Sequence, residues 1–267
     1  MGAAMIAEVW ELYRARDVVR AWTYRIVRAR YKQSVLGGLW AVLQPAASVA
    51  VFSVIFTLFV PIDTGDTPYV LFCYVAVVPW TLLSTSISDM SESLVTNMNL
   101  VTKIYVPREL FPLSAMLARL FDFVIAFAVV GLMIAYYRVE PFPTGWLFIP
   151  VVLAIQLALA LGLGLAGAAL NVFYRDIKHV VALGLSIWFY ASPIIYPGSA
   201  VAAHQGPIAY LYYLNPMAGV IEAYRAILLG HSLPGLHLVS SALTAATVLV
   251  AGYWFFKRVE AQFADVV

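Results

Sequence analysis

The sequence predicts an all-α integral membrane protein: six transmembrane helices, an N-terminal amphipathic interface helix, and re-entrant or interfacial external helices between spans five and six. Three observations support this fold class. The 267 residues are 63% hydrophobic and 11% charged, with a mean hydropathy of +0.88, whereas soluble domains are about one quarter charged. Apolar stretches long enough to cross a bilayer recur along the chain. Prolines break the apolar region that precedes the last of these stretches. We expect residues 1–267 to form a single transmembrane domain.

The first element is predicted over residues 8–32. At about 100° per residue, the apolar positions from Leu12 to Ala29 fall in one arc, and most of the basic residues lie outside it. A basic amphipathic helix with aromatic residues suits the membrane surface, while a solvated helix packed on a soluble partner would give the same pattern. Because a span follows at Gly37, we favour the interface helix.

The six spans carry different packing features. The first contains no charged residue, and we expect Pro45 to bend it because proline removes a helical hydrogen bond. The fourth is rich in small residues between Gly162 and Ala168, which permits close approach of a neighbouring helix. The spans are predicted at 37–60, 68–88, 110–137, 146–170, 180–196 and 236–256.

Residues 198–232 are predicted to form an external cap. Pro207, the Asn215-Pro216 pair and Gly219 divide the region into pieces of about two or three turns, whereas a hydrocarbon core needs about 20 helical residues. Interrupted helices at membrane depth require protein or water around the freed backbone groups. We therefore expect the cap to lie at the mouth of something polar.

The distribution of Lys and Arg predicts the orientation in the membrane. Of sixteen such residues, seven lie in the N-terminal arm, and two lie in each of the 89–109 loop, the 171–179 loop and the C-terminal segment. Arg138 and Arg225 fall on the opposite side. Because cytoplasmic loops carry the excess of positive charge, both termini are predicted to be cytoplasmic and the cap external.

Several classes of site are not supported by the sequence. It has no Gly-rich phosphate loop ending in Gly-Lys-Ser/Thr, which excludes nucleotide binding of that kind. Its four histidines are scattered, and Cys73 is the one cysteine, so we expect no metal site and no cofactor held by this chain. No Ser, His and Asp arrangement is legible either, and we expect no catalytic residue and no nucleic-acid partner.

Two charge pairs have helical spacing. Arg119 and Asp122 lie in the third span at i, i+3, where they can share a helix face and pair. Since charges at membrane depth face the protein interior or water, they indicate either a polar pathway or a mutually neutralised packing pair. Glu222 and Arg225 have the same spacing in the cap. For this second pair a structural lock is favoured over a direct substrate contact.

Aromatic residues crowd the outer end of the chain. They form either an interfacial belt or a sugar-stacking surface, since flat rings with a hydroxyl suit the faces and edges of pyranoses. Belt residues face lipid and a sugar track faces a pore, and the sequence leaves both interpretations open. The candidates for a glycan path and exit are Trp188, Tyr190, Tyr196, Tyr212 and Tyr213.

Five blocks of sequence carry a resemblance to a known family. They resemble permease subunits of bacterial ABC exporters for cell-surface polysaccharide, the O-antigen and teichoic-acid exporters of the second ABC-permease type, and they cover nearly the whole chain in order. The blocks are RYKQSVLGGLWAVLQP (30–45), LVTKIYVPRELFPLSA (100–115), LNVFYRDIKHV (170–180), ASPIIYP (191–197) and LNPMAGVIEAYRAILLG (214–230).

The resemblance implies a complex in the bacterial inner membrane. Such permeases work as two copies with two separate ATPase subunits, which hold ATP and Mg, and they move a polyprenyl-pyrophosphate-linked glycan outward. A teichoic acid or a smaller amphiphile is the alternative cargo. A membrane-embedded glycan-modifying enzyme is an alternative of another class, for which Glu222 is the candidate carboxylate.

The resemblance also implies roles for residues on the inner side. The amphipathic segment 94–106 would be a coupling helix inserted into the ATPase, although without the resemblance it could be an ordinary connection. Arg119 matches no part of the family pattern. Clustered basic residues next to the first span would meet the lipid pyrophosphate, which their attraction to lipid phosphates also favours. The coupling candidates are Leu94, Asn97, Lys103, Tyr105, Arg175 and Asp176, and the pyrophosphate candidates are Arg28, Arg30 and Lys32.

Overall fold

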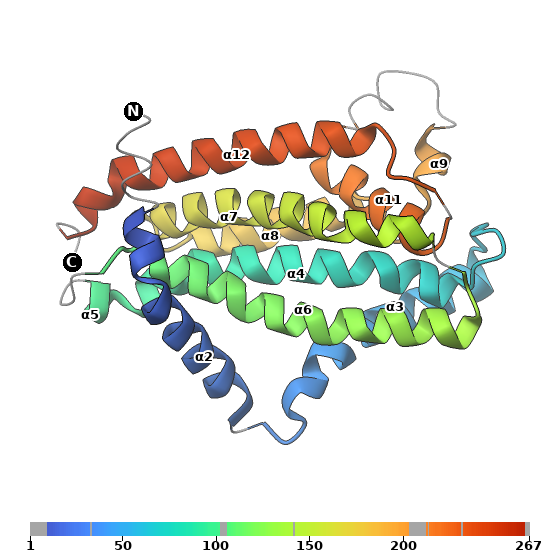
Figure 1. Ribbon diagram of the computed structural model, residues 1–267, viewed down its shortest axis with the longest axis horizontal. Helices are drawn as coiled ribbons and strands as arrows, with labels where there is room; N and C mark the ends of the chain where they lie inside the picture. The colour runs from blue at the N-terminus through green and yellow to red at the C-terminus, as the bar shows by residue number, and fades with distance from the viewer. Residues whose placement is uncertain are drawn as a thin grey trace.

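The computed structural model describes residues 10–32, 34–101, 106–140, 142–202, 212, 214–230 and 232–264. Every regular element in these ranges is a helix, and the longest helices lie side by side in a bundle (Figure 1). The α-helices are α2 (Arg16–Lys32), α3 (Trp40–Val54), α4 (Tyr69–Thr96), α5 (Met98–Val101), α6 (Leu110–Tyr137), α7 (Ile149–Phe173), α8 (Ile177–Tyr190), α9 (Gly198–Ala202), α11 (Pro216–Leu228) and α12 (His237–Glu260). Short 3-10 or π turns adjoin them at η1 (Gly37–Leu39), η2 (Ile55–Phe59), η3 (Pro143–Phe148) and η4 (Ala261–Ala264).

Five helical stretches in the described part of the chain are long and apolar enough to cross a membrane, which supports the predicted class of integral membrane protein. Each coincides with a predicted span. Helix α6 has the predicted bounds, and α4 continues to Thr96, beyond the predicted end at 88. The five stretches are Gly37–Phe59, Tyr69–Thr96, Leu110–Tyr137, Thr144–Phe173 and His237–Phe263.

The predicted fifth span at 180–196 has a different form. Helix α8 begins at Ile177 and ends at Tyr190, and a turn occupies the residues up to Pro197. Its 14 residues measure about 21 Å at 1.5 Å per residue, which is less than the roughly 30 Å of a hydrocarbon core. Six spans therefore remain a prediction, and they require α8 to be completed by neighbouring elements.

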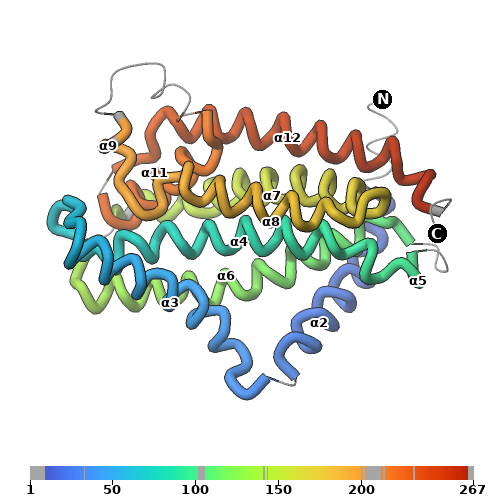
Figure 2. Tube along the Cα trace, turned by 180° about the vertical axis from the view of Figure 1, so that it is seen from behind, coloured from blue at the N-terminus to red at the C-terminus, as the bar shows by residue number. Residues whose placement is uncertain are grey.

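Helix α4 lies at the centre of the bundle. It packs against α6 on one side and α7 on the other, and α12 packs on the far side of α7 (Figure 1). From Tyr69 to Val78 nearly every residue of α4 is buried, so this helix is surrounded by protein over its N-terminal part. Viewed from behind, α8 lies along α4 and α7 (Figure 2).

Small residues permit the closest helix contacts. A Cβ atom on Gly162 of α7 would lie 2.5 Å from the backbone oxygen of Val248 in α12, and one on Gly252 would lie 2.1 Å from the oxygen of Gly162. On the opposite side of α7, Gly167 faces Ser91 of α4. The fourth span therefore packs through its glycines, as its composition predicts.

The two ends of the bundle differ. Helix α2 packs on α6 and diverges from the bundle toward its C-terminus, where it meets the start of α3 in a V (Figures 1 and 2). Helix α5 and the C-terminal end of α12 lie at one end, and α9 and α11 lie at the other (Figure 1). Helix α11 is largely buried against α12, α4 and α7. Its N-cap is Asn215, whose side chain accepts a hydrogen bond from the backbone N–H of Met217.

Candidate functional site

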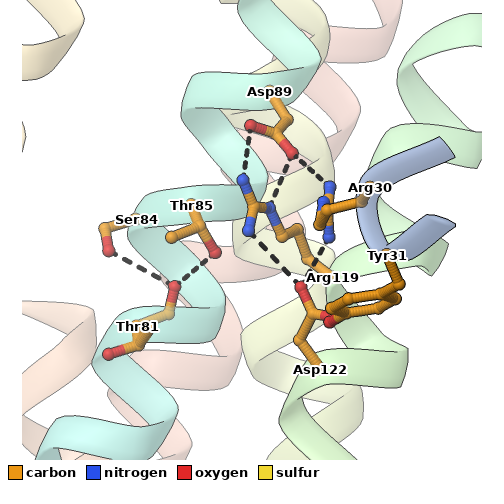
Figure 3. A network of polar contacts seen from close by, with 8 residues as sticks. All are labelled: Arg30, Tyr31, Thr81, Ser84, Thr85, Asp89, Arg119 and Asp122. Carbon is orange, nitrogen blue, oxygen red and sulfur yellow. Dashed lines mark hydrogen bonds and ion pairs between the residues drawn. The ribbon is translucent and has the colours of Figure 1, made fainter. Parts of the chain in front are cut away.

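Four charged residues from three helices form one closed cluster, shown in Figure 3. Arg119 of α6 donates to both oxygens of Asp89 in α4, with Nε–Oδ2 at 2.6 Å and Nη2–Oδ1 at 3.0 Å. Arg30 of α2 donates to Asp89 at 3.0 Å and to Asp122 of α6 at 2.5 Å. Arg119 also reaches Asp122 at 3.4 Å. The four side chains are 15–29% exposed, and their charges balance.

Tyr31 completes the cluster on the side of α2. Its hydroxyl donates to Oδ1 of Asp122. Burial, and then the neighbouring Asp122 carboxylate, raise the pKa of Tyr31 to about 12. The phenol is therefore a neutral donor at physiological pH, and Asp122 is held by Tyr31 as well as by the two arginines.

The cluster separates two hollows. A cavity of about 230 Å³ lies between α2, α3, α4 and α6, with Arg30, Tyr31 and Asp122 in its wall. A groove of about 410 Å³ lies between α4 and α8, with Asp89 in its wall. Arg119 and Thr85 line both hollows.

The groove has a hydroxyl-rich wall from α4 and an aromatic wall from α8. Ser84, Thr85 and Ser88 line it together with Phe189 and Tyr190. Ser84 and Thr85 both donate to the backbone oxygen of Thr81 (Figure 3). Their oxygens can still accept hydrogen bonds from a guest molecule.

An aromatic hollow of about 640 Å³ lies at the α9 end of the bundle, beside α8 and α9. Trp188, Tyr196 and Tyr212 line it, so the structure brings together three of the five predicted glycan-path residues. Trp188 is fixed by a 2.8 Å hydrogen bond from Nε1 to Oδ1 of Asn215. Tyr190 faces the neighbouring groove, and Tyr213 lies outside the described residues.

Arg225 holds the turn that follows α8. Its guanidinium donates to the carbonyl oxygens of Pro193 at 2.6 Å, Ile194 at 2.8 Å and Tyr196 at 3.3 Å. It also donates to the carbonyl of Phe72 and lies 3.5 Å from the centre of the Phe72 ring. Burial lowers the pKa of Arg225 to about 10, so the side chain remains a cation at neutral pH.

The predicted partner of Arg225 lies elsewhere. Within the described part of the chain, the ion pairs do not include one between Glu222 and Arg225. Glu222 instead packs against Gly198, where an added Cβ would lie 1.7 Å from Oε1. Burial raises the pKa of Glu222 above its usual range. The i, i+3 spacing is correct, but backbone carbonyls satisfy the guanidinium.

The inner-side candidates are dispersed. Leu94 is buried in α4, and Asn97 ends that helix with its side chain donating to the carbonyl of Ser93. Arg175 and Asp176 are exposed in the turn between α7 and α8. Among the pyrophosphate candidates, Arg28 and Lys32 are exposed, whereas Arg30 belongs to the charge cluster. Lys103 and Tyr105 fall outside the described residues.

A second ion network was not predicted. Lys257 near the end of α12 pairs with Glu109, which precedes α6, and with Glu260. Arg108 donates to the backbone oxygen of Glu260. The network joins the segment after the predicted coupling helix to the end of the last span. Each side of this network has two adjacent charged residues in the sequence, Arg108-Glu109 and Lys257-Arg258, and that pattern could have suggested the network.

Comparisons with known proteins give the family. Residues 18–229 match the ABC-2 type transporter family. The chain is 32% identical to the O-antigen export system permease protein RfbA of Myxococcus xanthus, over 98% of this chain and 99% of the relative. It is 25% identical to a Klebsiella pneumoniae protein of the same description, over 94% and 95%, and 26% identical to the polysialic acid transport protein KpsM of Escherichia coli, over 91% and 93%. The chain, with its bundle of apolar helices, therefore belongs to the ABC-2 type transporter family.

Proposed function

We propose that the chain is the transmembrane subunit of an ATP-driven exporter of a polyprenyl-pyrophosphate-linked polysaccharide resembling O-antigen. The observation that carries this function is the match, over nearly the full length of both chains, to relatives named as O-antigen export permeases. Permease subunits are transport components rather than enzymes. In the described residues, no group of three or more His, Cys, Asp or Glu is placed to hold a metal ion.

The active unit is a homodimer with two ATPase subunits. Helix α8 supports the dimer, because its exposed face carries Leu183 and Ile187 beside the hydroxyl-lined groove. Polar groups at membrane depth are costly against lipid, and a second copy across the groove would enclose them in a conduit. ATP and Mg belong to the ATPase subunits.

We infer a membrane topology of six spans, with both termini in the cytoplasm of the bacterial cell. Helix α8 and the apolar turn that continues it to Tyr196 make the fifth crossing, since α8 alone is too short. The outer turns and α11 then form the external cap. Basic residues gather at the opposite end, where cytoplasmic loops carry them.

The glycan follows α8 outward. It passes the groove with Tyr190 and then the aromatic hollow with Trp188, Tyr196 and Tyr212. Hydroxyl groups and flat rings suit a chain of pyranoses, since the rings stack on sugar faces while the hydroxyls exchange hydrogen bonds. ATP-driven movement reaches the permease through 94–106 and the Arg175-Asp176 turn.

Export in cells tests this function. The gene is expressed with its ATPase partner in a strain that lacks its own permease, and surface polysaccharide is measured. We expect export to require both subunits, and replacing Tyr212 by Ala to reduce the exported amount while the protein level is unchanged. Unchanged export in that variant would indicate that these aromatic residues form an interfacial belt rather than a sugar-stacking surface.

A capsule-type polysaccharide is the second candidate cargo, because relatives named as polysialic acid transport proteins match over 91% of the chain. Two strains distinguish these cargoes, because complementation of an O-antigen exporter and complementation of a capsule exporter are separate assays. A teichoic acid or a smaller amphiphile would complement neither.

A further inference from the structure

The charge cluster is the wall between the cavity and the groove. Asp122 lies on the cavity side, Asp89 lies on the groove side, and Arg119 faces both. Arg119 and Asp89 are joined by two hydrogen bonds of 2.6 and 3.0 Å. If this pair parted, the two hollows would be continuous past Thr85, which lines each of them.

The cavity itself is amphipathic. One end carries Arg30, Arg119 and Tyr31, and the remainder is lined by apolar side chains that include Pro45, Leu82 and Phe123. Its volume of about 230 Å³ is smaller than the roughly 300 Å³ at which pockets for drug-sized ligands begin. It therefore suits the headgroup of an amphiphile and the first part of its chain, rather than a polysaccharide.

The cluster cannot open without a replacement anion. Asp89 and Asp122 neutralise Arg30 and Arg119 in a setting only 15–29% exposed. Removing one partner of such a pair leaves an uncompensated charge. Phosphate oxygens accept the planar guanidinium fork in the same bidentate manner as a carboxylate. A phosphorylated headgroup could thus replace the two carboxylates as the hydrogen-bond acceptor of the arginines.

We propose that this cavity binds the diphosphate headgroup of an isoprenoid lipid, whose oxygens replace Asp122 and Asp89 on Arg30 and Arg119. The exchange opens the wall and lets the headgroup pass sideways from the cavity into the groove. The cluster then admits anionic lipids and stays closed to neutral ones. This inference rests on the proposed export function, because that function supplies the lipid-linked substrate.

Equilibrium binding to the purified full-length permease in lipid nanodiscs tests the site. The probes are radiolabelled farnesyl diphosphate, farnesol and inorganic diphosphate. The apolar wall and the arginines together predict that farnesyl diphosphate binds at least about tenfold tighter than either fragment, a difference of about 1.4 kcal/mol. Equal binding of farnesol and farnesyl diphosphate would overturn the proposal.

Two substitutions with opposite expected effects separate a binding site from a structural clamp. Asp122→Asn removes a competing carboxylate, so farnesyl diphosphate should bind several-fold tighter. Arg30→Gln removes a phosphate partner but leaves the Arg119–Asp89 pair, so binding should weaken about tenfold. The matched controls Asp17→Asn and Arg20→Gln change the same groups on the exposed face of α2 and should leave affinity unchanged. Weaker or unchanged binding in Asp122→Asn would refute the exchange.

The binding assay stands apart from the export assay. If farnesyl diphosphate behaves as expected but no polysaccharide is exported with the ATPase, the cargo is wrong and the headgroup site holds. If export proceeds while Asp122→Asn and Arg30→Gln shift affinity in the same direction, the site is wrong and the function holds. Labelling of the buried Cys73 by a maleimide during heating verifies that each variant is folded.

Discussion

Replacing Arg225 by Met should destabilise the outer end of the protein more than any surface change. The substitution orphans the carbonyls of Pro193, Ile194 and Tyr196, which accept from the guanidinium at 2.6–3.3 Å. At about 1–3 kcal/mol for each unsatisfied buried acceptor, the loss is roughly 3–9 kcal/mol. Relief from burying a cation offsets several kcal/mol of that loss, which leaves a net loss on the order of 3 kcal/mol.

Thermal unfolding measures this loss through the one cysteine in the chain. Cys73 is buried, so a maleimide dye reacts when the bundle opens. A loss of 3 kcal/mol corresponds to an apparent Tm lower by about 6–12 °C for a protein of this size. Arg225→Lys retains the charge but loses the planar fork and the contact with the Phe72 ring, and should lie between wild type and Arg225→Met.

The exposed Arg175 supplies the control, since Arg175→Met removes a guanidinium without orphaning a described carbonyl. All variants are compared at one heating rate, because unfolding of membrane proteins is often governed by a rate. An Arg225→Met variant that melts within about 2 °C of wild type would refute the reasoning that these hydrogen bonds hold the turn.

Three further substitutions test burial, close packing and the inner ion network. Burial raises the pKa of Glu222, so the charged carboxylate destabilises the folded wild type at neutral pH. Glu222→Gln should therefore have a higher apparent Tm than wild type at pH 7.5. This difference in Tm should shrink as the pH falls through the raised pKa and vanish below the ordinary pKa of Glu. Gly162→Ala should cost about 1–3 kcal/mol through overpacking because its Cβ meets the Val248 backbone, whereas Gly131→Ala, with nothing within 4 Å, should be neutral or stabilising. Lys257→Met leaves the buried Glu109 carboxylate without its Lys257 partner and should lower the apparent Tm, and adding Glu109→Gln should restore most of the loss; a double variant no better than the single one would count against the ion pair.

Hydropathy and residue spacing along the chain predicted helix bounds and one ion pair that lies within a single helix. The bounds of α6 follow from an apolar stretch between polar segments, and the i, i+3 spacing of Arg119 and Asp122 corresponds to an ion pair at 3.4 Å. The end of α8 was missed, because the apolar sequence continues through the turn at 191–196. Apolar residues predict burial, and they do not distinguish a buried helix from a buried turn.

Long-range partners could not be read from spacing. Arg30 lies 59 residues from Asp89 and 92 from Asp122 in the chain, and only the fold, which packs α2 on α6 beside α4, joins them. The partners of Arg225 are backbone carbonyls, which every residue has and which therefore leave no mark in the sequence. Helix faces can be predicted from one sequence, whereas the contacts between faces require the fold.

Helix α4 connects the two ends of the protein mechanically. Its 28 residues form one rod of about 42 Å, which reaches from the outer turn to Asn97 beside α5. At the outer end, Phe72 accepts from Arg225 and Tyr69 donates to the carbonyl of Ile195. A displacement of α4 at its α5 end would therefore be carried along one helix to the residues that anchor the turn after α8. The two ends of the bundle are thus joined by a single lever, without a relay of separate joints.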